Sequence, residues 1–342
     1  MKDDGSRLRG WRVPAWGVNC ALVALVAGMW PLDRVLVEQM DEYYLRVLIL
    51  VGLNVILATS LNLINGITGQ FSLGHAGFMA IGAYATGSLM KYFSPTGAGA
   101  EVALLALLIA GGLVAAVAGL LVGIPTLRLR GDYLAIATLG FGEIIYTLIV
   151  TTDRIGPFEI GSSSGLHAIP IRTSFFWAYA GAIVCVASIW RLSYSAKGLA
   201  FRAVREDEIA AAAMGIDTTY YKVLAFVIGA FFAGVAGGLY ATYDGNLAPE
   251  SFRFTKSIEI VVMVVLGGSG SITGVVLAAA VLTYLPEQLR FFAEWRMVIY
   301  SLALILMMLL RPEGLLGGRE LLRWRRVAAA TTVAGDAVES GR

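Results

Sequence analysis

Charged side chains are scarce in this 342-residue sequence, where only 15% of the residues are Asp, Glu, Lys or Arg. A soluble domain usually carries about 25%. The formal net charge of +2 excludes the strongly basic surface that nucleic-acid-binding proteins use, so we expect no nucleic-acid partner. Hydrophobic residues make up 58% and the mean hydropathy is +0.74, which excludes a disordered chain. The composition predicts a polytopic membrane protein surrounded by lipid and argues against a soluble enzyme.

Cysteine is also rare, and no nucleotide-binding motif occurs. Cys20 and Cys185 stand inside apolar runs without the spacing of metal ligands, so we expect neither a disulfide framework nor a metal site. The sequence contains no G-x-x-x-x-G-K-[ST] motif and no polar segment long enough to form an ATP-hydrolysing domain. The chain is therefore predicted not to be an enzyme and to hold no cofactor itself. Any ATP would be bound by partner subunits.

Long apolar runs, in contrast, are abundant. A helix needs about 20 mostly apolar residues to cross a bilayer, and none of these runs alternates as the strands of a membrane barrel do. The predicted fold class is an all-α polytopic integral membrane protein with about eight to ten transmembrane helices, because only helices satisfy their own backbone in lipid. Expected spans lie at 16–32, 43–64, 71–90, 102–124, 133–150, 174–190, 222–243 and 297–310.

A further apolar segment at 258–285 is interrupted by Gly267-Gly268-Ser269-Gly270. Most of the 26 basic residues share one side of the membrane if the N-terminal tail is cytoplasmic. A single crossing at 258–285 would place the arginine-rich C-terminal tail on the opposite side. We therefore expect this segment to be re-entrant and to turn back at its glycines, so that both termini are cytoplasmic. The alternative is that one of the other spans is assigned wrongly.

This topology predicts three regions. Residues 1–15 form a cytoplasmic tail, residues 16–310 form the transmembrane domain, and residues 311–342 form a basic cytoplasmic tail. The longest cytoplasmic loop lies within the second region, at 193–221.

The segment at 54–84 reads NVILATSLNLINGITGQFSLGHAGFMAIGAY and is too polar for a lipid-facing helix. Neutral hydrogen-bonding groups suit a path for a polar or zwitterionic solute, because they offer no fixed charge that would trap it. Glu143 is added to these groups because a carboxylate inside a span is a functional candidate, whereas Glu259 starts its segment and could reach the membrane interface. The alternative is that the amides and glycines only pack helices. The path candidates are Asn62, Asn65, Gln70, Ser72, His75 and Glu143, and the candidate glycine breaks are Gly66, Gly69, Gly74, Gly267, Gly268, Gly270 and Gly274.

The cytoplasmic loop contains GLAFRAVREDEIAAAAMGID, whose alanines, arginines and glutamates favour a helix. Gly215 is placed to end this helix, and Asp217 is placed to cap the next one. A short, exposed and capped helix suits docking into a groove of a partner protein. A solvated loop helix without a partner is the alternative.

Four motifs occur in one order: GITGQFSLGHAGFMAIGAY, then RAVREDEIAAAAMGID with YKVLAF shortly after it, then LGGSGSITGVVLAA, and finally RPEGLLG. Together they resemble the permease subunits of high-affinity branched-chain amino-acid ABC importers, most closely the LivM-type subunit. The resemblance covers about residues 54 to 317. It implies a bacterial inner-membrane subunit that pairs with a second, LivH-type permease. Two cytoplasmic ATPases and a periplasmic or lipid-anchored solute-binding protein would complete the importer.

The same resemblance implies that the loop helix is the coupling helix. The positions that match the ATPase-facing motif are Arg205, Glu206, Asp207, Glu208, Ala211 and Gly215. The implied cargo is leucine, isoleucine or valine. Two alternatives stay open, a permease for urea or short amides and a gradient-driven transporter or channel. The scarcity of carboxylates in the spans favours the ATP-driven importer over the gradient-driven one.

Overall fold

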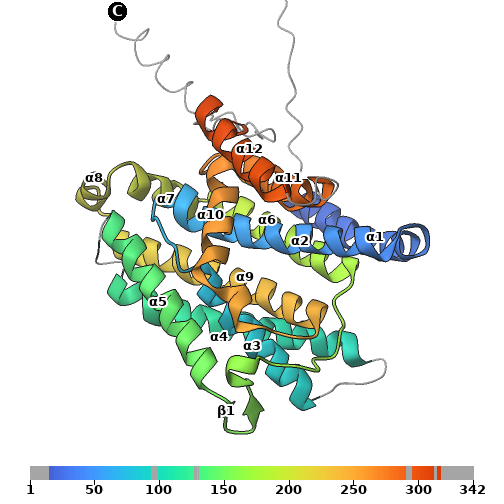
Figure 1. Ribbon diagram of the computed structural model, residues 1–342. Helices are drawn as coiled ribbons and strands as arrows, with labels where there is room; N and C mark the ends of the chain where they lie inside the picture. Colours follow the sequence, from blue (N-terminus) through green and yellow to red (C-terminus); the bar gives the residue numbers. More distant parts are fainter. Residues whose placement is uncertain are drawn as a thin grey trace, which may run out of the picture.

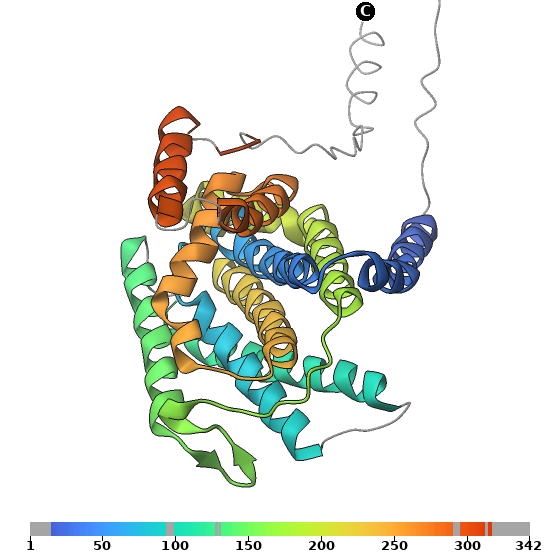
Figure 2. The same ribbon diagram turned by 45° about the vertical axis from the view of Figure 1, so that its right-hand side comes forward.

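The structure, a computed structural model, describes residues 15–93, 99–126, 129, 131–289, 295–311 and 314–316. The predicted tails lie almost entirely outside these residues. Figure 1 shows a bundle in which α9 runs between an upper group of helices (α1, α2 and α6) and a lower group (α3 and α4). Figure 2 shows the same bundle after a turn of 45°, with α9 again between α2 and the lower group. The helices are α1 (Ala15–Gln39), α2 (Glu42–Asn62), the π-helix η1 (Leu63–Ile67), α3 (His75–Phe93), α4 (Ala100–Thr126), α5 (Asp132–Thr151), the 3-10 helix η3 (Ser162–Ser164), α6 (Phe175–Ser193), α7 (Ala196–Glu206), α8 (Glu208–Ala213), α9 (Thr218–Asp244), the 3-10 helix η4 (Pro249–Phe252), α10 (Phe254–Gly267), α11 (Ile272–Gln288) and α12 (Arg296–Leu310).

The predicted fold class is confirmed. Within the described residues, five helical stretches are long and apolar enough to cross a membrane, namely Glu42–Ile67, Ala100–Thr126, Asp132–Thr151, Phe175–Ser193 and Thr218–Asp244. The other predicted spans correspond to α1, α3, α12 and the pair α10 and α11, which are shorter or less apolar. The described strands are β1 (Arg154–Ile155) and β2 (Phe158–Glu159), a small hairpin between α5 and α6. Beside this hairpin, the hydrogen-bonded Lys91 ammonium lowers the pKa of the Glu159 carboxyl.

Small residues allow α9 to pack tightly against its neighbours in the centre of the bundle. A Cβ atom added at Gly82 of α3 would lie 2.2 Å from the Cα of Gly234 in α9, and one added at Gly119 of α4 would lie 2.5 Å from the Cβ of Ala230. Glycine at such positions lets helix backbones touch inside a membrane. The rings of Phe78 and Phe226 meet edge to face beside them. For these glycines the structure supports the packing interpretation.

The predicted span at 71–90 is wrong at its start, because α3 begins only at His75. Residues 69–74, which precede α3, form neither helix nor strand, and side chains from distant parts of the chain hold this region. The Leu73 amide donates to Thr138 Oγ1 over 3.0 Å, and the Ala76 amide donates to Ser257 Oγ over 3.0 Å. Non-helical backbone is tolerated within a membrane protein where other parts of the protein surround it. This crossing is therefore discontinuous, with a non-helical first part and a helical second part.

The predicted glycine break is present between α10 and α11. Residues 268–271 form a turn (the 268–271 turn), which Asn62 of α2 holds by accepting from the Gly270 amide over 2.9 Å. With 14 residues, α10 is about 21 Å long, shorter than the roughly 30 Å hydrocarbon core. The chain that follows α12 returns to the same place, since the Leu315 amide donates to Leu266 O over 2.7 Å.

The loop at 193–221 contains two helices where one was predicted. Asp207 is extended and separates α7 from α8, and its carboxylate caps α8 by accepting from the Ile209 and Ala210 amides over 2.8 and 3.0 Å. The two predicted end signals are confirmed. Gly215 adopts a left-handed φ of 83° after α8, and Asp217 caps α9 by accepting from the Tyr220 amide over 3.0 Å.

Candidate translocation path and coupling loop

Buried polar atoms without partners lie in α2 and in residues 70–75, before and at the start of α3. In the part of the chain that the structure describes, both amide atoms of Gln70, Ser72 Oγ, His75 Nδ1 and Thr59 Oγ1 are buried and make no hydrogen bond. Buried polar groups nearly always have a partner, and leaving one without a partner costs free energy. We call Thr59, Gln70, Ser72 and His75 the unpaired polar cluster. These buried atoms have hydrogen-bonding capacity that the described residues leave unused.

His75 is held in one tautomer. Its Nε2 lies 2.9 Å from Ser60 Oγ, and that hydroxyl donates its own proton to Leu57 O. The Ser60 oxygen is therefore the acceptor, and His75 Nε2 is the donor. A neutral ring then leaves Nδ1 as an unused acceptor within the unpaired polar cluster.

The other candidates for the path have different positions. Asn62 holds the 268–271 turn, and Asn65 clamps Ser72 by accepting from its amide over 3.1 Å and donating to its carbonyl over 3.4 Å. Asn65 thus shapes the backbone close to Gln70, and Asn62 shapes the 268–271 turn. Glu143 does not join this group. Its side chain lines an open hollow on the surface of α5 with Ile144 and neighbouring residues.

Arg205 connects the loop at 193–221 to both breaks in the membrane region. From the end of α7 its Nη1 donates to Gly66 O over 2.6 Å. A Cβ at Gly69 would lie 2.9 Å from Arg205 Cγ, and a Cβ at Gly270 would lie 2.6 Å from Arg205 Nη1. Both glycines also adopt left-handed φ values, of 75° and 92°. The structure therefore brings together residues that the sequence analysis assigned to separate groups, through a contact we call the Arg205 link.

The remaining predicted glycine breaks also lie at close approaches. Gly74 faces the Thr138 carbonyl of α5, and Gly268 adopts a φ of 98° in the turn. Gly267 and Gly274 meet where α10 and α11 cross, and a Cβ at Gly274 would lie 2.0 Å from Gly267 O. These positions allow α10 and α11 to fold back on each other.

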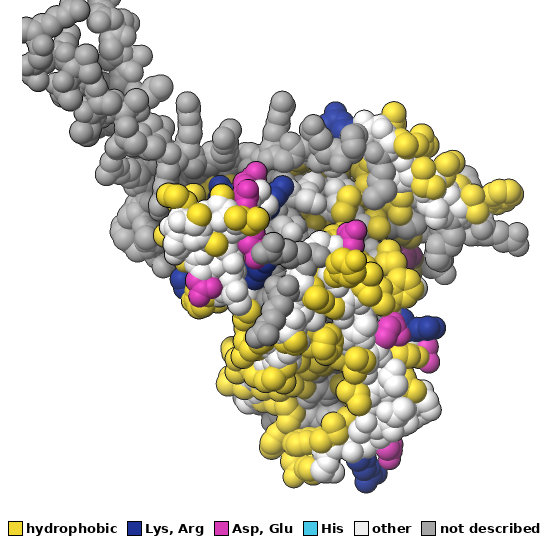
Figure 3. All heavy atoms as spheres, turned by 90° about the vertical axis from the view of Figure 1, so that its left-hand side faces the viewer, with side chains coloured by type: hydrophobic (Ala, Val, Ile, Leu, Met, Phe, Trp, Pro, Cys, Tyr) yellow, Lys and Arg dark blue, Asp and Glu magenta, His cyan; other side chains and the backbone are white. Residues whose placement is uncertain are grey.

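The surface of the loop at 193–221 carries both apolar and charged side chains. Ile209 and Met214 of the α8 region are 69% and 83% exposed, whereas Ala211 is buried. Arg205 and Glu206 have exposed parts, and Glu208 lies 2.6 Å from Lys222 Nζ at the start of α9. Figure 1 places α7 and α8 at the left end of the bundle, and Figure 3 shows apolar side chains over much of the described surface seen from that side, with charges of both signs between them. Exposed apolar side chains on a polar loop are typical of a docking surface.

Glu208→Lys is expected to destabilise the loop by about 3 kcal/mol, because it sets two ammonium groups against each other at a largely buried position. The midpoint of thermal unfolding in detergent should fall. Glu206→Lys, on the exposed neighbouring position, is the control and should leave the midpoint unchanged. The exchange Glu208→Lys with Lys222→Glu should restore the midpoint. A single Glu208→Lys variant as stable as the parent would show that this ion pair does not hold α8 on α9.

Sequence reasoning missed a polar network between α2, α10 and α11. Lys256 Nζ lies 3.0 Å from Glu259 Oε2 and donates to Asn54 Oδ1 over 3.4 Å. Asn54 in turn donates to Thr283 Oγ1 over 2.9 Å. The predicted span began at residue 258 and so omitted Lys256. A lysine three residues before Glu259, on the same face of one helix, was the available signal.

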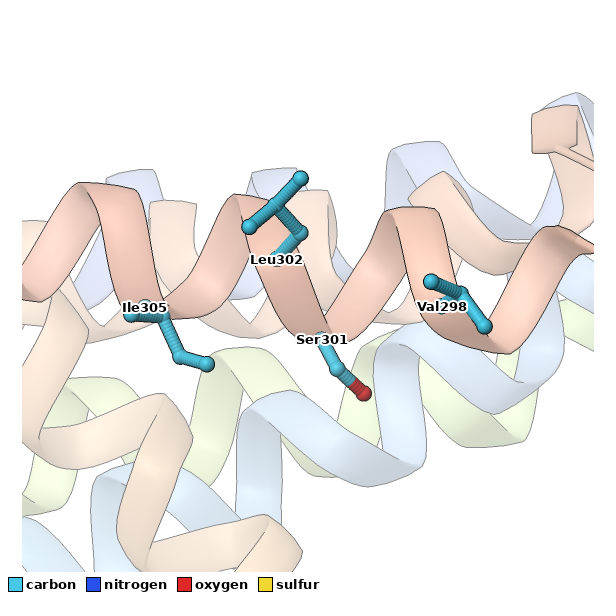
Figure 4. Close-up of a pocket in the computed structure, with 4 residues that line it drawn as sticks. All are labelled: Val298, Ser301, Leu302 and Ile305. Carbon is cyan, nitrogen blue, oxygen red and sulfur yellow. The ribbon is translucent and has the colours of Figure 1, made fainter.

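A hollow along α12 carries no polar network. Val298, Ser301, Leu302 and Ile305 line it, and all four belong to α12 (Figure 4). A depression along one helix with a single hydroxyl suits lipid contact, and we assign it no solute.

Comparison with known protein families shows which family the chain belongs to. Residues 43–310 match the family model described as branched-chain amino acid transport system / permease component. The chain belongs to this family. The permease family and the apolar helices make it a multi-pass membrane protein.

Several relatives carry the same description. The chain is 38% identical to the high-affinity branched-chain amino acid transport system permease protein LivM of Salmonella typhimurium, over 77% of this chain and 67% of that one. It is 25% identical to a probable LivM permease of Methanocaldococcus jannaschii, over 81% and 94%. It is also 32% identical to LivH of Salmonella typhimurium, over 48% and 54%. No solved structure matches the chain.

Proposed function

We propose that this chain is a membrane-spanning permease subunit of an ABC importer that moves leucine, isoleucine or valine inward. The observation that carries this proposal is the family match over residues 43–310, together with the names of the relatives. ATP hydrolysis in separate subunits drives transport, and this chain neither binds ATP nor catalyses a reaction.

The discontinuous crossing before α3 supports passage of a zwitterion. An amino acid must bring a carboxylate and an ammonium out of water together, and leaving either unpaired is costly. Gln70 offers an unused donor and acceptor, and Ser72 and His75 add a hydroxyl and an acceptor nitrogen. Transporters commonly place polar sites at interrupted helices near the middle of the membrane. The unpaired polar cluster is therefore our candidate for part of the path.

The loop formed by α7 and α8 supports coupling to an ATPase. Ile209 and Met214 provide exposed apolar anchors, and the caps at Asp207 and Gly215 fix the short helix that carries them. When the ATPase moves this loop, the Arg205 link transmits the movement to the helix breaks in the membrane region. In this proposal the exposed residues of the loop bind the ATPase, and Arg205 transmits the movement of the loop into the membrane region.

The remaining parts of the importer follow from the same proposal. A LivH-type permease pairs with this chain in the bacterial inner membrane, two ATPases bind its cytoplasmic face, and a periplasmic or lipid-anchored binding protein delivers the solute. Gly314, after α12, packs against Gly268 beside the Arg205 link. This proximity supports a C-terminal tail on the same side as the coupling loop. With a cytoplasmic N-terminal tail, both termini are cytoplasmic.

An affinity tag on this chain tests the proposed assembly. The purified complex should contain an ATPase with a Walker-A motif and a second permease, and leucine with its binding protein should stimulate ATP hydrolysis. Stimulation by urea or short amides in place of leucine would favour the first alternative. Transport by the chain without any ATPase would favour the gradient-driven alternative.

Gln70→Leu is expected to lower leucine uptake about tenfold without lowering stability. Leucine has nearly the size of glutamine, and replacing an unpaired buried amide with an apolar group is neutral or stabilising for the fold. Uptake of radiolabelled leucine should fall, while the affinity of the isolated binding protein stays the same. Normal uptake at equal membrane abundance would show that this segment only packs.

A further inference from the structure

The ion pair between Lys256 and Glu259 lies in the middle of the membrane-spanning region. Lys256 contacts Asn54, and Asn54 lies midway between Glu42 and Ile67, the ends of the most buried of the apolar stretches that are long enough to cross a membrane. Charged groups at the bilayer centre cost several kcal/mol and are rarely present without a function. The pair is therefore unlike an interfacial ion pair, where water would solvate both groups.

One side of this pair is open. In this chain 22% of the Lys256 side chain and 43% of the Glu259 side chain are exposed. The ammonium makes two hydrogen bonds, to Asn54 and Glu259, and retains a third N–H group. Among the described residues, Glu259 Oε1 has no partner. The open side thus presents one free donor on a cation and one free acceptor on an anion.

The helix that carries this pair, α10, also contacts the start of α3. Ser257, the residue after Lys256, accepts from the Ala76 amide, and Ala76 follows His75 of the unpaired polar cluster. A charged pair of this kind is unfavourable against lipid. Asn54 and Thr283 fix the position of Lys256, because Asn54 donates to Thr283 while it accepts from Lys256.

We propose that Lys256 and Glu259 form a transient binding site for the charged end of an amino acid in the path. Lys256 donates to the α-carboxylate and Glu259 accepts from the α-ammonium. The two groups of the solute are separated by one carbon, and the two charges of the pair lie 3.0 Å apart, so one zwitterion can bridge both. When the solute leaves, the side chains pair again and no uncompensated charge remains. This inference rests on the proposed function.

Charge variants in the complex purified through this chain and reconstituted in liposomes test the site. Lys256→Met and Glu259→Gln should each lower leucine uptake at least tenfold, while binding-protein-stimulated ATP hydrolysis persists. Lys91→Met, which removes the partner of Glu159 in an ion pair beside the β1–β2 hairpin, is the control and should leave uptake unchanged. The exchanged pair Lys256→Glu with Glu259→Lys should assemble normally but should not regain uptake, because it binds the solute in the reverse orientation.

The outcomes separate the possible failures. Uptake restored by the exchanged pair, or loss of assembled complex in both single variants, would overturn the binding site in favour of a purely structural ion pair. Normal uptake by both single variants would overturn it as well. Absence of leucine uptake by the unaltered complex would instead refute the proposed function on which the inference rests.

Discussion

Gly66→Ala is expected to abolish the assembled transporter, because it places a methyl group where two breaks in the membrane region meet. The added Cβ would lie 2.0 Å from Asn62 Oδ1 and 2.3 Å from the Gly270 amide nitrogen. The hydrogen bond that Asn62 accepts from Gly270 cannot form around it, and the Gly66 carbonyl that receives Arg205 must move. Overpacking together with a lost buried hydrogen bond costs about 3 kcal/mol or more.

Thermal unfolding of the purified chain and its yield with partners measure this effect. Gly140→Ala is the matched control, because a Cβ at Gly140 in α5 meets no atom within 4 Å. The control should keep its stability and assembly. A Gly66→Ala variant that unfolds at the same temperature as the control would mean that the Asn62, Gly66 and Gly270 contacts are not as the structure has them.

Arg205→Met is expected to uncouple ATP hydrolysis from transport. The variant keeps the length and packing of the side chain but loses the hydrogen bond to Gly66 O, so movement of α7 and α8 no longer reaches the 268–271 turn. Leucine uptake should fall by more than tenfold, basal ATP hydrolysis should remain, and its stimulation by the loaded binding protein should be lost.

Arg202→Met provides a close control on the same helix. Arg202 also donates to a backbone carbonyl over 2.6 Å, that of Ser193, and it lies over the Tyr194 ring, but it does not touch the 268–271 turn. Uptake by this control should stay within about twofold of the parent. Equal losses in the two variants would indicate a general effect on α7, and normal uptake by Arg205→Met would refute the Arg205 link.

Local chemistry allowed several features to be predicted from the sequence. Gly215 and Asp217 act on residues within one helical turn, so their roles as helix end and helix cap could be identified without tertiary information. The break at Gly267-Gly268-Ser269-Gly270 was equally visible, because such a run cannot continue an apolar helix without cost. The division of the loop at Asp207 was missed because strong helix formers on both sides concealed a cap.

The other features that were missed or predicted wrongly depend on contacts between residues far apart in the sequence. The start of α3 at His75 depends on Thr138 and Ser257, which are 65 and 181 positions away from the amides they receive. No local pattern indicates such partners. The contact of Arg205 with Gly66 spans 139 positions, so the sequence identified both residues but not their connection. That Lys256 lies deep in the membrane-spanning region likewise follows only from its contact with Asn54, which is 202 positions away in the sequence.

The central claim is that this chain forms part of an ATP-driven importer of branched-chain amino acids. The most direct test is leucine uptake into liposomes that contain the complex purified through this chain. ATP is supplied inside or outside the vesicle, as the orientation of the complex requires. The account predicts accumulation of leucine against its gradient that needs both ATP and the binding protein. Leucine equilibration at the same rate without ATP would contradict it.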